Sequence, residues 1–295
     1  MEVQIKPYQA DIVLLLVAIS WGTTFVIVQE AIDTVPVYTF LFWRFGFAFL
    51  LMSLISWRHF GKFTKSTLWA SALLGALNFA AFAFQTYALT LTLSSTVAFI
   101  TGLNVIFIPF LAYIFFKKSI SVSVLIGAGI AVLGLWFLTM QGGVSIGAGE
   151  VYTLICAVLV SLHILYTDRF SRQYEVMLLV MTQFGVIALA SMLMGFAVDG
   201  SVIPATYSYE FILALVTTVL FATVFAFWAQ TSMQRYTTPA KTALIFTVEP
   251  LSAAVFGYLY AGELLLPIQL LGGVMIVAGV LYAELATIKK AKLEA

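Results

Sequence analysis

Long apolar stretches recur along the whole chain and are separated by short polar connections. The hydrocarbon core of a bilayer is about 30 Å thick, so an α-helix needs about 20 apolar residues to cross it. Ten stretches are predicted to be such helices: residues 11–29, 36–57, 66–88, 95–116, 121–140, 149–168, 176–198, 209–231, 238–260 and 266–286. These runs do not alternate between polar and apolar residues, which excludes a transmembrane β-barrel. The pattern therefore predicts an all-α membrane protein with ten transmembrane helices.

The composition supports this fold class and excludes several functions. Only 9% of the residues are charged and 62% are apolar, whereas soluble domains carry about 25% charged residues. The net charge of +1 gives no reason to expect a nucleic-acid partner. The single cysteine, Cys156, excludes an internal disulfide, and two histidines, His59 and His163, do not form a helical metal-binding pair. We expect the lipid bilayer as a partner, and no metal or cofactor.

The distribution of basic residues predicts the orientation of the chain. All Lys and Arg residues except Arg44 fall at the termini or in connections on the N-terminal side of the predicted helices. The opposite connections carry acids instead, such as Asp33, Asp199 and Glu263. Basic connections remain in the cytoplasm, so both termini are predicted to be cytoplasmic. The residues before the first span do not resemble a cleavable signal peptide.

An internal repeat divides the chain into two parts. A shift of 145 positions aligns the third to fifth spans with the eighth to tenth without a gap, and places Phe82 on Phe227 and Gln85 on Gln230. Five spans per repeat is an odd number, so the second repeat crosses the membrane in the opposite direction. We predict two inverted five-helix repeats, residues 1–145 and 146–295. Inverted repeats are typical of secondary transporters that expose one central site alternately to each side.

The glycine-rich segment at residues 141–150 lies close to the boundary between the two repeats. Its glycines could suggest a phosphate-binding loop, but the sequence GxxxxGK[ST] is absent. We therefore interpret it as a turn between helices.

Four motifs resemble a known family. They are SWGTTFV at 20–26, Arg44 within FLFWRFGFAF, VEP at 248–250, and GYLYAGELLLPIQLLGGVMIVAGV at 257–280. Together they resemble the drug/metabolite transporter superfamily, specifically its EamA type. The resemblance implies a ten-helix exporter of the cytoplasmic (inner) membrane with a central cavity, and it does not name a substrate. The first copy departs from the pattern, with Lys117-Lys118 where the second copy has Gly262-Glu263.

A polar and aromatic stripe occurs once in each repeat at helical spacing. Its residues are Asn78, Phe82 and Gln85 on the third span and Thr223, Phe227 and Gln230 on the eighth. One interpretation is that the two stripes form walls of a ligand cavity, where amides bind polar groups and rings hold an apolar body. The alternative is that the amides join neighbouring helices by hydrogen bonds.

The fourth and ninth spans carry further polar residues. Thr101 and Asn104 are three residues apart on the fourth span, and Thr242 and Glu249 are seven apart on the ninth. Glu249 lies about 16 Å from the cytoplasmic end of its helix, where an ionised carboxylate is costly unless it is paired or solvated. It is either a protonatable coupling or binding group or a hydrogen-bonded structural carboxyl. Pro250 beside it is expected to kink the helix.

Arg44 is the basic residue predicted to lie deepest in the membrane, about 12 Å below the outer surface. Three roles compete for it. The side chain could extend to the outer headgroups, form a structural ion pair, or bind an anionic group of a substrate through its planar guanidinium.

Two more residues and one set of glycines have alternative interpretations. His163 is either a satisfied polar residue or a proton relay, and Trp21 either lines a cavity or packs in the core. Four glycines at heptad spacing are predicted to allow close helix packing. They are Gly127 and Gly134 on the fifth span and Gly272 and Gly279 on the tenth.

These observations favour a secondary active transporter that exports a small organic metabolite, such as an amino acid, a related compound or a drug-like compound. The alternative is a membrane-embedded enzyme acting on a lipid or small molecule. Motifs such as HExxH and GxGD are absent, so we do not expect an enzyme. No ATP-binding motif is present, which leaves an ion gradient, with the proton as candidate, or the gradient of the substrate itself. We take a monomer as the working oligomeric state.

Overall fold

The computed structural model describes residues 7–117, 120–138, 146–237, 242 and 245–293. Within these ranges every regular element is a helix. The α-helices are α1 (Pro7–Ile32), α2 (Val37–Ser56), α3 (Lys65–Leu89), α4 (Ser94–Thr101), α5 (Asn104–Phe116), α6 (Val122–Leu138), α7 (Ala148–Ser171), α8 (Val176–Met194), α9 (Tyr209–Thr217), α10 (Ala226–Met233), α12 (Val248–Ala261) and α13 (Pro267–Leu293). Short 3₁₀ segments follow α2 (η1, Trp57–Lys62) and α10 (η4, Gln234–Tyr236), and π-helical segments follow α8 (η2, Gly195–Asp199) and α9 (η3, Thr218–Phe225).

The helices have the length and the apolar composition of a multi-pass membrane protein. In the described ranges, seven helical segments are long and apolar enough to cross a membrane, and α6 and Pro267–Ala283 of α13 are shorter apolar helices. Large apolar side chains cover the outside of the bundle; Leu54 is 72% exposed and Trp69 is 78% exposed. Such a surface suits lipid and is rare on soluble monomers. The prediction of an all-α membrane fold is confirmed.

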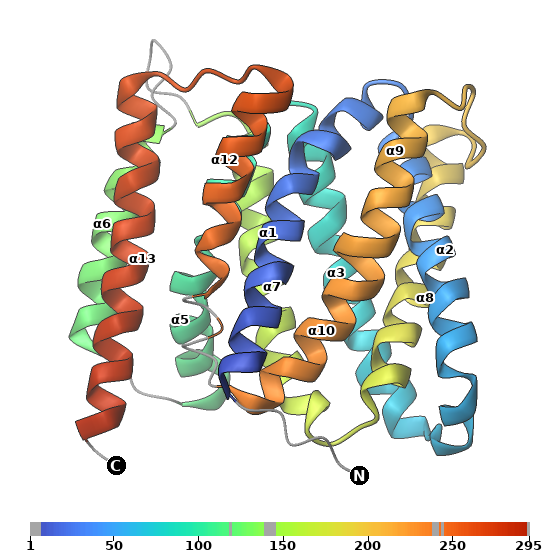
Figure 1. Cartoon of the computed structure of the whole chain (residues 1–295), viewed down its shortest axis with the longest axis horizontal. Helices are drawn as coiled ribbons and strands as arrows, with labels where there is room; N and C mark the ends of the chain where they lie inside the picture. The colour runs from blue at the N-terminus through green and yellow to red at the C-terminus, as the bar shows by residue number, and fades with distance from the viewer. Residues whose placement is uncertain (1–6, 118–119, 139–145, 238–241, 243–244, 294–295) are drawn as a thin grey trace.

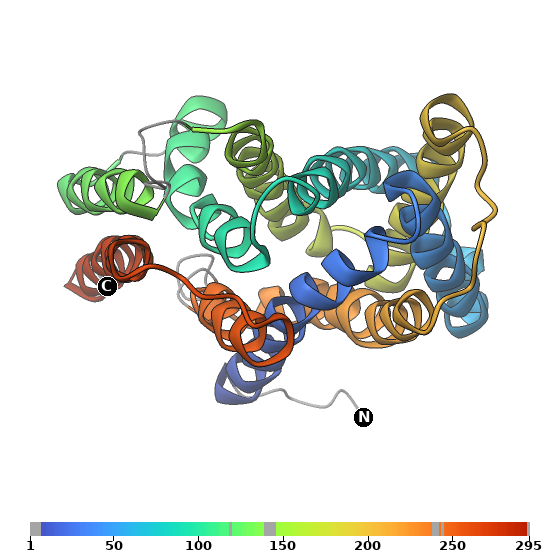
Figure 2. The same ribbon diagram turned by 90° about the horizontal axis from the view of Figure 1, so that it is seen from above.

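The helices form two layers, and a pair of helices closes the bundle on each lateral side (Figures 1 and 2). One layer contains α3, α4, α5 and α7, and the other contains α1, α9, α10 and α12. On one lateral side α2 packs against α8, and on the other α6 packs against α13. Each layer thus combines helices from both predicted repeats: α1 lies with the helices of the second, and α7 with those of the first.

Glycines bring the outer pair, α6 and α13, into close contact. A Cβ atom on Gly134 would lie 2.6 Å from the carbonyl oxygen of Gly272, and one on Gly279 would lie 2.5 Å from that of Gly127. No larger residue fits at these positions without moving the backbone of the partner helix. The prediction that these glycines serve close helix packing is confirmed.

Turns interrupt the fourth and ninth spans, although Ser94–Phe115 of the fourth is long and apolar enough to cross a membrane, as predicted. In the fourth span, α4 ends at Thr101 and α5 begins at Asn104. In the ninth, residues 245–246 are helical, Thr247 forms a turn, and α12 begins at Val248. Thr247 is the counterpart of Gly102 under the 145-residue shift, so both spans break at the same place in the repeat. Pro250 therefore stands in the first turn of a new helix, where the missing N–H costs nothing, and does not kink a continuous one.

The ends of α5 and α12 also correspond. Both helices terminate in the left-handed conformation, at Lys117 (φ 56°) and at Gly262 (φ 62°), which are 145 positions apart. Glycine adopts this conformation without strain, whereas a lysine does not. The conformation is thus kept in the first copy although its sequence departs from the glycine of the second.

Candidate functional site

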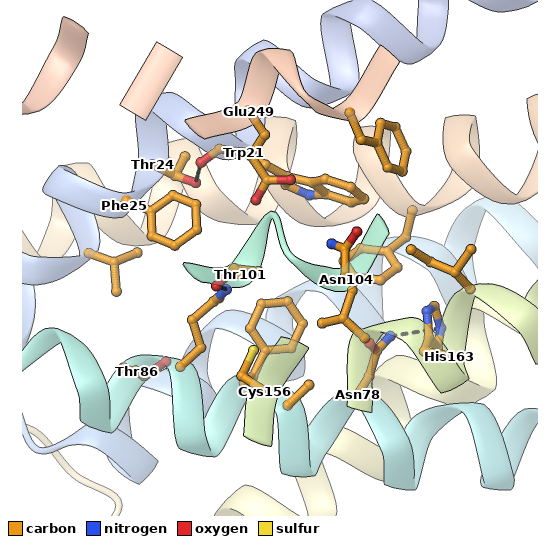
Figure 3. A pocket seen from close by; sticks show the side chains of 18 of the residues that line it. Trp21, Thr24, Phe25, Asn78, Thr86, Thr101, Asn104, Cys156, His163 and Glu249 are labelled. Atoms are coloured by element: carbon orange, nitrogen blue, oxygen red, sulfur yellow. Dashed lines mark hydrogen bonds between the residues drawn. The ribbon is translucent and has the colours of Figure 1, made fainter. Parts of the chain in front are cut away.

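A cavity lies between the two layers, near the breaks in the fourth and ninth spans. Its volume of about 80 Å³ leaves room for several water molecules. Side chains of α1, α2, α3, α4, α5, α7, α10 and the segment 245–249 line it (Figure 3). The sequence-predicted residues among them are Trp21, Arg44, Asn78, Phe82, Gln85, Thr101, Asn104, His163, Phe227, Gln230 and Glu249. Thr223 and Thr242, also predicted, are buried but do not line it.

A buried polar cluster forms one part of the wall. Asn78 Nδ2 lies 3.0 Å from His163 Nε2, and the same ring nitrogen lies 2.9 Å from Gln183 Oε1. Thr167 Oγ1 lies 3.3 Å from this nitrogen. His163 and Asn78 are joined across α7 and α3, as Figure 3 shows, and Gln183 reaches them from α8. His163 is therefore a hydrogen-bonded polar residue that also lines the cavity, and it lies eight residues before the end of α7 because this helix continues to Ser171.

The two repeat-related glutamines lie toward opposite ends of the cavity. Gln85 is close to the end of α3 at Leu89, and Gln230 is close to the end of α10 at Met233, and these two helix ends lie on opposite sides of the bundle (Figure 1). Gln85 Nε2 donates a long hydrogen bond of 3.4 Å to Thr101 Oγ1. Gln230 Oε1 is buried and has no hydrogen-bond partner among the described residues.

Arg44 is buried in the wall of the cavity and does not extend toward the headgroups, which corrects one of its three expected roles. Its Nε donates to Thr223 Oγ1 at 2.8 Å, and its guanidinium carbon lies 4.8 Å from the ring centre of Phe82. Among the described residues, no carboxylate forms an ion pair with it. Thr223 thus fixes the position of the Arg44 side chain by accepting this hydrogen bond. The structural ion pair, the second of the three possible roles, is not observed among the described residues.

A π-helical segment creates an acceptor beside Arg44. The carbonyl of Ala222 in η3 accepts the indole N–H of Trp21 at 3.0 Å and a longer bond of 3.5 Å from Arg44 Nη2. π-Helical turns inside α-helices are frequent at functional sites. Trp21 both lines the cavity and contacts the rings of Phe227 and Phe246, at centroid distances of 5.6 and 5.3 Å.

Glu249 and Asn104 stand in the first turns of α12 and α5, immediately after the two helix breaks. They are counterparts under the 145-residue shift, and Figure 3 shows both side chains directed into the same central space. Glu249 is 7% exposed and Asn104 is 3% exposed. None of the ion pairs among the described residues involves the Glu249 carboxylate.

Sequence reasoning missed further lining residues, although helical spacing could have found most of them. Thr24, Phe25 and Val28 follow Trp21 at intervals of three, four and seven, so they share its face of α1. Cys156 and Val160 precede His163 by seven and three on α7. Gln183 belongs to the polar cluster without lining the cavity, and only its position as a polar residue inside an apolar helix signalled a role.

Comparison with known proteins decides the family. The profile of the EamA-like transporter family matches residues 9–140 and again residues 147–284. The chain belongs to the EamA-like transporter family. An Archaeoglobus fulgidus protein (strain ATCC 49558 / DSM 4304 / JCM 9628 / NBRC 100126 / VC-16) named "Uncharacterized transporter" is similar to this EamA-like protein over 284 residues, with 29% identity. The match covers 95% of this chain and 87% of that protein.

The fold of this EamA-like protein also occurs in a solved crystal structure. The two chains superpose with a TM-score of 0.70 at 17% sequence identity, over 98% of this chain and 99% of the other. At this identity the likeness shows the fold alone. The family membership makes the chain a membrane transporter of the drug/metabolite transporter superfamily, which confirms the resemblance seen in the motifs and argues against the enzyme alternative.

Proposed function

We propose that this EamA-like protein is a secondary active transporter that exports a small organic metabolite, such as an amino acid or a related or drug-like compound. One observation carries the proposal. A cavity between the two layers of the bundle is lined by polar and aromatic residues from both predicted repeats. Several of them are related by the 145-residue shift, including Phe82 with Phe227 and Gln85 with Gln230. Two related walls around one cavity are the arrangement that alternating access requires.

In this proposal residues 1–145 and 146–295 form the inverted repeats, and both termini lie in the cytoplasm. The first residues of α1 and the last of α13 lie at the same end of the bundle (Figure 1). The charge asymmetry of the connections assigns this end to the cytoplasm, and export then runs toward the end that contains the turn between α1 and α2.

Transport by proteoliposomes tests the function. Purified protein is reconstituted, and uptake of labelled amino acids and other metabolites is measured with and without an imposed pH gradient. Gln230→Leu removes a buried amide from the cavity and is expected to lower transport about tenfold. Gln173→Leu, in the exposed turn between α7 and α8, is the matched control and is expected to transport normally. Equal transport by both variants would argue against the cavity as the transport site.

Proton coupling is assigned to Glu249 because this buried carboxylate lines the cavity and forms no ion pair among the described residues. Glu249→Gln keeps the shape and one acceptor oxygen and removes the titration. At saturating substrate we expect this variant to transport at a rate that no longer depends on the pH gradient. Wild-type dependence on the gradient in Glu249→Gln would exclude it as the coupling group.

A further inference from the structure

Two helix breaks deliver a carboxylate and an amide to the same space inside the cavity. Glu249 belongs to the first turn of α12 and Asn104 to the first turn of α5, and both are more than nine-tenths buried. Figure 3 shows the two side chains pointing into the central space from opposite sides of it. The two residues are counterparts under the 145-residue shift, and both line the cavity.

Two buried amide oxygens of residues that line the cavity, Asn104 Oδ1 and Gln230 Oε1, have no hydrogen-bond partner among the described residues. The Glu249 carboxylate also lines the cavity, and none of the ion pairs among the described residues involves it. The opposite charge, Arg44, is already held by Thr223 and the carbonyl of Ala222 and does not pair with Glu249. Buried acceptors without partners are costly, so a ligand that fits here is one that donates.

We propose that Glu249 and Asn104 form a subsite for the protonated primary amine of the transported metabolite. This deepens the proposed function, on which it rests. An ammonium group carries three donors and no acceptor, which matches the free acceptors of the subsite. An ammonium group would also supply a counter-charge for the Glu249 carboxylate, which forms no ion pair among the described residues. The ring of Trp21, which contacts Phe227 and Phe246, borders the space and attracts cations.

The ammonium subsite is tested by binding, independently of transport. Thermal unfolding of the purified protein in detergent is followed with increasing butylamine or phenethylamine, and with butanol or phenethyl alcohol as uncharged partners of the same skeleton. A ligand that binds the folded state raises the unfolding temperature, and the concentration dependence gives its affinity. We expect at least one amine to bind about tenfold more tightly than its alcohol.

Three variants locate the amine. Glu249→Gln is expected to weaken amine binding about tenfold, and Asn104→Leu about fivefold, with alcohol binding unchanged in both. Glu210→Gln removes an equal charge from the exposed first turn of α9 and is expected to bind amines normally. Thermal unfolding without ligand reports whether each variant is folded. If only one of the two cavity variants is folded, that variant alone serves for the test.

The possible outcomes separate this inference from the proposed function. Equal affinity for amines and alcohols, no binding of either amine, or unchanged amine binding in both cavity variants overturns the ammonium subsite and leaves the transporter in place. Amine-selective binding that depends on Glu249, together with no transport of any metabolite, overturns the proposed function and supports the subsite.

Discussion

Arg44 illustrates how a single buried charge is accommodated at membrane depth. Its guanidinium is almost fully buried, donates to Thr223, and lies over the ring of Phe82. Removing a charge from water costs several kcal/mol unless polar contacts compensate for it. The aromatic face of Phe82 and the hydroxyl of Thr223 provide part of this compensation, and Arg44 also lines the cavity. We therefore propose Arg44 as a binding group for an acidic part of the substrate.

Substitution of Arg44 tests the role of its planar guanidinium group. Arg44→Lys keeps the charge but loses the bidentate geometry and the donor that reaches Thr223. We expect affinity for a carboxylate-bearing compound to fall about tenfold and affinity for phenethylamine to stay within about twofold. The measurement is the ligand-dependent rise in unfolding temperature, with 3-phenylpropionate as the carboxylate. Equal loss for both ligands would show that Arg44 supports the cavity without selecting charge.

At the scale of elements, one carboxylate joins the two repeats at the end of the bundle opposite the start of α1. Glu263, in the turn after α12, accepts hydrogen bonds from the backbone N–H groups of Ser94 and Ser95 at 2.9 and 3.1 Å, and from the Ser95 hydroxyl. These groups begin α4 and have no partner inside that helix. Glu263, the acid of the sequence motif at residues 257–280, thus caps α4, a helix that is distant in the chain.

Removing this cap is expected to destabilise the protein. Glu263→Ala leaves buried N–H groups without an acceptor, at a cost of about 1–3 kcal/mol. Unfolding of the purified protein by heat should therefore begin at a lower temperature than in the parent. Glu210→Ala removes an exposed acid of the same end of the bundle and should change the unfolding temperature little. Similar behaviour of the two variants would contradict a capping role.

The contact between α6 and α13 gives a second test at this scale. Gly134→Ala places a methyl group 2.6 Å from the Gly272 carbonyl oxygen, so the helices must separate, at a cost of about 1–3 kcal/mol. Gly129→Ala, on the same helix, meets no atom within 4 Å and is expected to be neutral or stabilising by up to about 1 kcal/mol. Thermal unfolding distinguishes the two. A Gly134→Ala protein as stable as Gly129→Ala would exclude tight packing of this pair.

At the scale of the whole molecule, the proposed orientation follows from the charges at the two ends of the bundle. Cysteines at Lys62 and at Thr206 lie in connections at opposite ends, and both positions are exposed. In intact cells we expect an impermeant thiol reagent to label Thr206→Cys and to leave Lys62→Cys unlabelled. The parent chain, whose single cysteine, Cys156, is buried, serves as the background. The reverse labelling pattern would invert the orientation and the direction assigned to export.

The sequence alone determined the features that depend on local composition. The hydropathy of each segment determines whether it crosses the membrane, the Lys and Arg residues predict which connections stay inside, and heptad glycines predict a close helix pair. The 145-residue repeat also indicated that Gln85 and Gln230 are equivalent. These properties can be read from neighbouring residues or from a simple period, because they do not require knowledge of which distant segment is adjacent.

Only the tertiary structure decided the contacts between distant residues. Thr223 was predicted to line the cavity, yet it supports Arg44 from 179 positions away, and Glu263 caps a helix 169 positions away. The breaks at Gly102 and Thr247 were also not predictable from hydropathy, because broken and continuous spans are equally apolar. A backbone can leave the helical path inside a membrane only where the surrounding helices and a polar cavity satisfy its groups. Which helices surround each break is a property of the assembled bundle, and it is what places Glu249 and Asn104 in one site.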